Sequence, residues 1–269
     1  MTDRHAAERP GFVERLGARW IARFREGLYA IGFFFRVIVE TFRSIRKSPL
    51  GNRVLTMQIL FTGVEALSVV AVLSVALGAV IIVQGLSLLP QFGQGRLIYS
   101  ILITVITREL GPILTAFIIA ARSGTAIATE LGNMVTSHEI EAYVSAGIDP
   151  ISYLVVPRFL GVTISMVVLN LYFNIFGLLG SYIVTQFVRS IGFAEYFSNL
   201  LSTIAVVDVV SSLIKSLVFG AIISTVATYY GFKVERSYTE VPQMAIKSVG
   251  QGFTLLIVAN AVLTLVYYV

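Results

Sequence analysis

The chain has 269 residues, of which 56% are hydrophobic and 13% are charged, and its mean hydropathy is +0.84. Soluble domains carry about 25% charged residues, so this composition excludes an ordinary soluble fold. The absence of cysteine excludes disulfides, thiolate catalysis and cysteine metal sites, and the presence of only two histidines argues against a histidine-rich site. We therefore expect no bound metal.

The formal net charge of +5 is concentrated at the start of the chain. Residues 1–63 carry eleven Lys or Arg against five Asp or Glu, which leaves the remainder slightly acidic. A basic region beside an apolar body favours contact with an anionic membrane surface. Nucleic acid is not expected as a partner.

Long gaps between charged residues predict the membrane-spanning segments. No charge lies between Glu65 and Arg96, between Arg158 and Arg189, or after Lys247. A helix needs about 20 apolar residues to cross a bilayer, and each gap is long enough for one crossing. Together with two further apolar stretches, the gaps predict spans near 66–89, 97–121, 159–186, 206–230 and 250–268. The predicted fold is an all-α polytopic membrane protein.

Residues 27–48 are predicted to form an amphipathic helix in the plane of the membrane. One face is charged, with Arg36, Glu40, Arg43 and Lys47. The other face is apolar, with Ile31, Phe34, Phe35, Ile38, Phe42 and Ile45. A sixth span is the alternative, and a signal peptide is not expected. The predicted organisation is a basic cytoplasmic region over 1–63 and a membrane-embedded domain over 64–269.

The positive-inside rule predicts the orientation of the chain. With the basic N-terminus in the cytoplasm, five spans place 122–158 and 231–249 on the same side and the C-terminus on the opposite side. The two cytoplasmic segments contain Arg122, Arg158, Lys233, Arg236 and Lys247, and the opposite loops contain Arg96 and Arg189.

Two adjacent charges, Arg108 and Glu109, interrupt the second span. A charge at mid-membrane costs about 2.5–3.5 kcal/mol on insertion scales, so each is expected to have a partner elsewhere. Asp208 and Lys215 in the fourth span lie at a comparable depth and are candidates. Pro112 cannot donate to the carbonyl of Arg108, which predicts a kink and a free acceptor beside the charges. The functional interpretation is a site for a lipid headgroup, and the alternative is a structural ion pair.

The segment 122–158 is acidic and long for a connecting loop. Thr136 or Ser137 is predicted to cap a short helix, Gly147 to end it, and Pro150 to follow. Such a helix would suit docking into a soluble partner, and an ordinary loop is the alternative. In addition, Gly177 and Gly180 favour close helix packing. Motifs of enzymes and of ATP-binding P-loops are absent, so the chain is not expected to be an enzyme.

Three segments together resemble the MlaE/YrbE family of permeases. They read RELGPILTAFIIAARSGTAIATELG, EIEAYVSAGIDPISYLVVPR and TEVPQMAIKSVGQGFTLLIVANAVLT, in that order. The resemblance covers the chain from about Leu55 to the C-terminus. It implies a homodimeric permease of an ABC transporter in which each protomer has an interfacial helix and five spans.

The resemblance also implies the partners and the substrate. A separate cytoplasmic ATPase would bind ATP and Mg²⁺, so this chain would bind no cofactor itself. A small STAS-domain subunit and an MCE-domain periplasmic protein are further expected partners. The substrate class would be phospholipid or a related lipid, moved between the inner membrane and the envelope to maintain outer-membrane lipid asymmetry.

Residue roles follow from the same resemblance. Arg108 and Glu109 match the charged pair near the family's lipid cavity, and Lys215 is included as their candidate partner. Apolar Leu67, Val70, Leu73 and Leu77 are expected to contact acyl chains. Coupling to the ATPase is expected from Glu130, Glu139, Glu141, Ala142, Tyr143, Gly147 and Asp149. A permease of an ABC importer for small solutes, an intramembrane enzyme and a non-transporting membrane scaffold are the competing interpretations.

Overall fold

A computed structural model describes residues 12–47, 52–88, 97–188, 191–235 and 237–268, with side chains for 25–45, 55–88, 97–188, 191–235 and 237–267. Five helical stretches are long and apolar enough to cross a membrane, and they are Leu55–Leu88, Leu97–Thr136, Ile151–Val188, Val206–Phe232 and Glu240–Tyr267. The predicted all-α fold with five spans is confirmed. Arg96, Arg189, Arg236 and residues 1–11, 48 and 89 lie outside the described residues, as does the side chain of Lys47.

The first three spans combine several helical segments. The first consists of α2 (Asn52–Gly63), η1 (Val64–Ala66) and α3 (Leu67–Leu88). The second consists of α4 (Leu97–Leu102), η3 (Ile103–Leu110), α5 (Gly111–Ile119), η4 (Ala120–Gly124) and α6 (Thr125–Thr136). The third consists of η5 (Ile151–Val155) and α8 (Val156–Val188).

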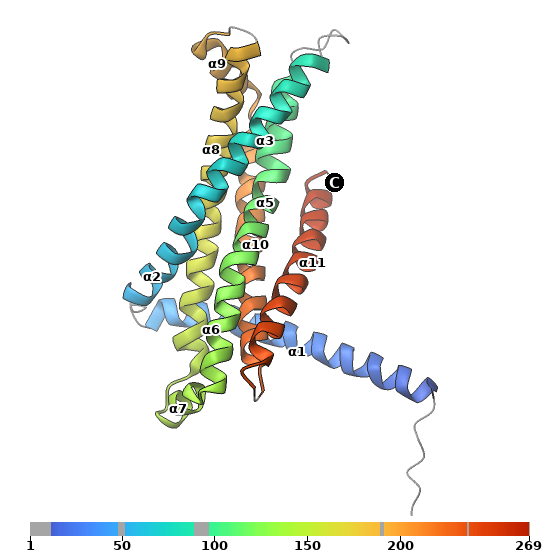
Figure 1. Ribbon diagram of the computed structural model, residues 1–269, viewed down its shortest axis with the longest axis vertical. Coiled ribbons are helices and arrows are strands. Elements are labelled where there is room, and N and C mark those ends of the chain that lie inside the picture. Colours follow the sequence, from blue (N-terminus) through green and yellow to red (C-terminus); the bar gives the residue numbers. More distant parts are fainter. Residues whose placement is uncertain (1–11, 48–51, 89–96, 189–190, 236, 269) are drawn as a thin grey trace, which may run out of the picture.

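The remaining elements complete the bundle and cap its ends. The fourth and fifth spans are α10 (Val206–Phe232) and α11 (Glu240–Tyr268). The short helix α7 (Glu139–Ser145) lies at one end of the bundle, and α9 (Phe193–Thr203) lies at the other end (Figure 1). α9 was not predicted from the sequence. Its buried Tyr196 shares a 2.7 Å hydrogen bond with Ser181 of α8. Burial raises the pKa of the Tyr196 hydroxyl to about 12.

The spans are longer than the gaps between charges predicted. Span ends were predicted at Glu65 and Arg122. They lie within helical segments, Glu65 in η1 and Arg122 in η4, and form an ion pair with each other. Arg158 likewise pairs with Glu130 at 2.7 Å. It lies within the helix of the third span, which begins at Ile151. The predicted loop 122–158 is therefore wrong, because helix continues to Thr136 and resumes at Ile151. The first span also begins within the region 1–63.

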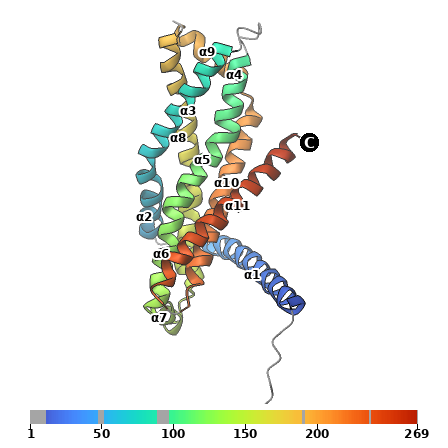
Figure 2. The same cartoon turned by 45° about the vertical axis from the view of Figure 1, so that its right-hand side comes forward.

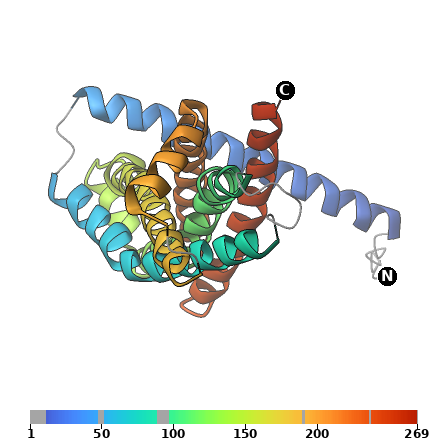
Figure 3. The ribbon, with the colours of Figure 1, turned by 90° about the horizontal axis from the view of Figure 1, so that it is seen from above.

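The interfacial helix is longer than predicted. α1 runs over Phe12–Lys47 instead of 27–48 and crosses the bundle at the end that carries α7 (Figures 1 and 3). Val37 is buried against Ile151 and Val155, whereas Phe35 and Phe42 are exposed. This amphipathic helix lies across the bundle and is not among the spans found in the described residues, which argues against a sixth crossing.

The closest packing in the core is between α3 and α8. A Cβ added to Gly78 would lie 2.1 Å from the carbonyl oxygen of Gly177, and one added to Gly180 would lie 2.8 Å from the Cα of Val75. Backbones approach this closely only where side chains are absent. The predicted packing role of Gly177 and Gly180 is confirmed.

Two helices diverge from this core. α1 extends past the side of the bundle, and the far half of α11 leans away from it (Figure 2). The apolar window of α11 is 11% buried, against 28–44% in the other four spans. α11 is therefore the span with the most uncovered surface.

Candidate functional site

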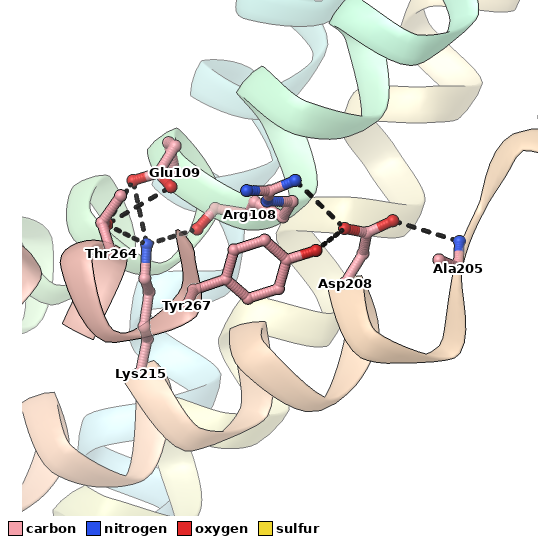
Figure 4. Close-up of polar contacts among 7 residues, drawn as sticks. All are labelled: Arg108, Glu109, Ala205, Asp208, Lys215, Thr264 and Tyr267. Atoms are coloured by element: carbon pink, nitrogen blue, oxygen red, sulfur yellow. Dashed lines mark hydrogen bonds and ion pairs between the residues drawn. The ribbon is translucent and has the colours of Figure 1, made fainter. Parts of the chain in front are cut away.

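Four charged side chains from two spans form a buried charged centre, which comprises Arg108, Glu109, Asp208 and Lys215. η3 contributes Arg108 and Glu109, and α10 contributes Asp208 and Lys215 (Figure 4). The two cations and two carboxylates balance one another. Because an unpaired charge among apolar helices is costly, this balance is what allows four charges inside a spanning bundle.

Glu109 and Lys215 form the tighter pair. The Nζ atom of Lys215 lies 2.9 Å from Oε2 of Glu109 and donates to the Oγ1 of Thr264 at 2.8 Å. Thr264 donates in turn to Glu109 at 3.1 Å, and Asn260 donates to the same carboxylate at 3.4 Å. The polar face of α11 thus completes the pair.

Arg108 and Asp208 form the second pair. The Nη1 atom of Arg108 lies 3.5 Å from Oδ1 of Asp208, and the guanidinium lies over the ring of Tyr267, 3.9 Å from its centroid. The hydroxyl of Tyr267 donates to the same carboxylate oxygen at 3.3 Å. Asp208 also accepts from the backbone N–H of Ala205 at 3.1 Å, so it fixes the start of α10. The predicted partners of Arg108 and Glu109 are confirmed.

The backbone around the pair is π-helical and not α-helical. In η3 the N–H of Gly111 donates to the carbonyl of Ile106, five residues earlier. Pro112 follows directly and cannot bond the carbonyl of Arg108. That carbonyl accepts from the Nζ of Lys215 at 3.0 Å, which confirms the predicted free acceptor. Such π segments occur frequently at functional sites.

The four charges differ in accessibility. The side chain of Lys215 is 1% exposed, and those of Asp208 and Arg108 are 9% and 11% exposed. Glu109 is 28% exposed and is the most open of the four. A polar ligand would therefore reach Glu109 first, whereas a phosphate at Arg108 would have to compete with Asp208. For Arg108 this geometry favours the structural ion pair over the headgroup contact.

The four residues predicted to meet acyl chains occupy α3, which packs mainly against α8. Val70 is fully buried in the core, so a lipid could reach it only if α3 moved. Leu67, Leu73 and Leu77 are half-buried against the same core. The four residues follow the core side of α3, and their contact with acyl chains stays a prediction.

The residues predicted for coupling divide into an exposed set and an anchoring set. Glu139, Glu141 and Ala142 are exposed on α7, and Glu141 lies 3.0 Å from Nδ1 of His138. Tyr143 is half-buried against Tyr153, with ring centroids 5.3 Å apart. Gly147 has a φ of +76° and ends α7 as predicted.

Three details of this segment differ from the prediction. Glu130 lies on α6, paired with Arg158, and not in a loop. Thr136 and Ser137 do not cap α7, because both hydroxyls donate back to the carbonyl of Asn133 at the end of α6. Asp149 accepts from the N–H of Ser152 at 3.2 Å and lies 3.6 Å from Arg36, so it joins the start of the third span to α1.

Asn260, Thr264 and Tyr267 of α11 were not predicted as part of this site. These polar residues follow one another at three- and four-residue spacing, which places them on one face of α11. That spacing was the available signal. A polar stripe in an otherwise apolar final span indicates a face turned toward other polar groups and not toward lipid.

The fold and the site together define a polytopic membrane protein with a charge-balanced polar centre and a short exposed helix between its second and third spans. The chain belongs to the family described as Permease MlaE, which matches residues 55–266.

Named relatives agree with this family. A probable ABC transporter permease protein of Rickettsia typhi is 31% identical over 235 residues, which cover 87% of this chain and 91% of the relative. The intermembrane phospholipid transport system permease protein MlaE of Haemophilus influenzae is 25% identical, covering 96% and 97%. The chloroplastic protein TRIGALACTOSYLDIACYLGLYCEROL 1 of Arabidopsis thaliana is 28% identical, covering 83% and 64%.

Proposed function

We propose that this chain is the permease subunit of an ABC transporter that moves phospholipid or a related lipid between the inner membrane and the envelope. The observation that carries the proposal is the partly exposed Glu109–Lys215 pair inside an apolar bundle. A lipid needs an apolar path for its chains and a few fixed polar groups for its headgroup. Family membership and the phospholipid transport named for the Haemophilus influenzae relative support this substrate class.

The headgroup would approach Glu109 and Lys215, and Arg108 would hold the second pair in place. Leu67, Leu73 and Leu77 would meet acyl chains only if α3 moved relative to α8. Transport by alternating conformations would require such a bistable packing. A small-solute importer would not need an apolar path for its cargo, and a non-transporting scaffold would need neither that path nor a movement of α3.

The proposed assembly is a homodimer with a separate ATPase. The uncovered face of α11 would pack against a second copy, and the exposed residues of α7 would dock into the ATPase, which would bind ATP and Mg²⁺. A STAS-domain subunit and an MCE-domain periplasmic protein are proposed further partners. Support for an ATPase comes from the ABC transporter named for the Rickettsia typhi relative.

The proposed location is the inner membrane with the N-terminus in the cytoplasm. The end of the bundle that carries α7 also carries α1 (Figure 1), and Lys233 pairs with Glu26 of α1. The positive charges at this end favour the cytoplasmic side. Five crossings then place the C-terminus in the periplasm.

Lipid analysis by mass spectrometry tests the substrate class. The protein purified in detergent from native membranes should carry phospholipid, and the variant Glu109→Gln/Lys215→Met should carry about one phospholipid fewer per chain. Lys247→Met, which alters an exposed lysine of α11, is the control and should match the wild type. Equal lipid in all three proteins would refute the headgroup role of the pair.

A further inference from the structure

A cavity of about 510 Å³ lies between α1, α10 and α11, separate from the charged centre. Its apolar wall consists of Ile31 and Phe34 from α1, Ile222 and Val226 from α10, and Leu255 from α11. The volume is within the range of about 300–1,000 Å³ that small-molecule sites occupy. α1 runs along the side of the bundle near the end that carries α7 (Figure 2). Because residues of α1 line the cavity, we place it at the level where an interfacial helix meets lipid headgroups.

The rim of the cavity carries one cation and one anion. The Nζ atom of Lys233 lies 2.9 Å from Oε1 of Glu26, and their side chains are 35% and 60% exposed. The same Nζ lies 5.9 Å and 6.0 Å from the ring centroids of Tyr229 and Tyr230. Burial lowers the pKa of Lys233, but the hydrogen bond with Glu26 and the nearby tyrosines raise it above its ordinary value, so the amine stays charged.

A threonine that lines the cavity has a buried hydroxyl with no partner among the described residues. Thr225 is 5% exposed and lines the cavity, and its Oγ1 makes no hydrogen bond within the part of the chain that the structure describes. Buried polar atoms are almost always paired, so this hydroxyl calls for an acceptor from a ligand. Thr225 lies two helical turns, about 12 Å along the axis, from Lys233 and therefore deeper in the membrane.

We propose that this cavity binds one zwitterionic glycerophospholipid from the adjacent leaflet. Its phosphate pairs with Lys233, and its ammonium pairs with Glu26 beside the faces of the two tyrosines. An ester carbonyl accepts from Thr225, and an acyl chain lies along Ile222 and Leu255. A cation and an anion on one rim match a headgroup that carries both charges, whereas an anionic headgroup would be repelled by Glu26.

The site shares no residue with the charged centre, so either proposal can fail without the other. The binding test uses native mass spectrometry of the full chain in detergent with added phosphatidylethanolamine. Leu255→Trp fills the cavity and should reduce the bound lipid about fivefold. Ile175→Trp adds the same side chain at an exposed position of α8 and should leave binding unchanged. Equal binding by the two variants would overturn the proposal.

Variants that remove one charge from the rim identify the headgroup. Lys233→Gln should weaken both phosphatidylethanolamine and phosphatidylglycerol, whereas Glu26→Gln should remove the preference of the wild type for phosphatidylethanolamine. Thr225→Val keeps the shape but removes the hydroxyl, and it should weaken binding about threefold. A wild type that prefers phosphatidylglycerol, or a Lys233→Gln variant that binds as well as the wild type, contradicts the proposal.

A second copy of the chain is the competing occupant. Because the chain contains no cysteine, Gln251→Cys introduces a single thiol at the cavity wall. In native membranes this thiol should not form a disulfide-linked dimer, and added phosphatidylethanolamine should slow its reaction with a membrane-permeant maleimide. An efficient disulfide between two copies would overturn the lipid assignment in favour of a protein contact.

Discussion

Glu109 and Lys215 occupy a depth at which an isolated charge would cost several kcal/mol, and each is tolerated because the other is 2.9 Å away. The same holds for Arg108 and Asp208, whose pair is reinforced by Tyr267. A buried pair of this kind adds little net stability compared with apolar residues. Removing one partner, however, leaves the other as an unpaired buried charge, which is costly. The arrangement therefore fixes the geometry of three spans more than it strengthens them.

The variant Lys215→Met should destabilise the protein because it leaves Glu109 with no cation in an apolar bundle. We expect a loss toward the lower end of about 3–5 kcal/mol, since Glu109 is partly exposed. Thermal unfolding in detergent measures it, with Lys247→Met as the matched control. The double variant Glu109→Gln/Lys215→Met should recover most of the loss, and additive effects of the two substitutions would contradict the pairing.

The sequence predicted the two charged pairs but not their whole surroundings. Asp208 and Lys215 could be inferred as partners because depth in a membrane follows from distance along a span. Asn260, Thr264 and Tyr267 were missed because their contribution depends on how α11 is rotated toward η3, which no single span determines. The π-helical form of η3 was missed for a similar reason, since Pro112 predicts a lost hydrogen bond but not how the backbone compensates.

At the scale of elements, the contact between α3 and α8 is the tightest in the bundle. Gly78→Ala should place a Cβ against the backbone of Gly177, which cannot move without shifting a helix. We expect a loss of about 1–3 kcal/mol, as for overpacked cores. The unfolding midpoint in detergent measures it. Gly250→Ala in α11 meets nothing within 4 Å and serves as the control; an equal effect of the two variants would exclude the proposed close approach.

The ends of the spans were predicted too short for a physical reason. Charges were treated as marks of the membrane surface, yet Glu65 with Arg122 and Glu130 with Arg158 neutralise each other along adjacent helices. Paired charges do not end a helix. Only pairing seen in three dimensions separates these residues from those that do face water, such as Glu139.

The exposed face of α7 should control binding of the ATPase. Glu139→Lys reverses an exposed charge for which the described residues show no hydrogen bond or ion pair, and it should reduce co-purification of the nucleotide-binding subunit from native membranes about tenfold. Glu195→Lys makes the same change on α9 at the opposite end of the bundle and should have no effect. Normal recovery of the subunit with Glu139→Lys would count against docking at α7.

At the scale of the whole molecule, the uncovered surface is concentrated on α11 and α1. Five spans and an interfacial helix could be predicted from hydropathy and helical periodicity. The leaning of α11 could not, because it depends on how that helix packs against α10 and α6. The cavity beside α1 could not either, because its walls come from segments more than 180 residues apart in the sequence. A bundle with one span this exposed is expected to bury it against another copy.

The substitution Ala261→Trp should weaken that association. Ala261 is exposed on α11 and lies on the side of the helix away from the cavity residue Leu255. We expect the wild type to be a dimer in detergent by native mass spectrometry and the variant to be mostly monomeric. Ile175→Trp on α8 is the control and should remain dimeric. A monomeric wild type would refute the proposed homodimer.

The most direct test is ATP-driven transfer of a fluorescent phospholipid by the assembled transporter reconstituted in vesicles. The variant Glu109→Gln/Lys215→Met keeps the bundle neutral and should transfer lipid about tenfold more slowly than the wild type, with its dimer and its ATPase subunit retained. Transfer at the wild-type rate by a folded, fully assembled variant would contradict the account, because the charged centre would then be structural only.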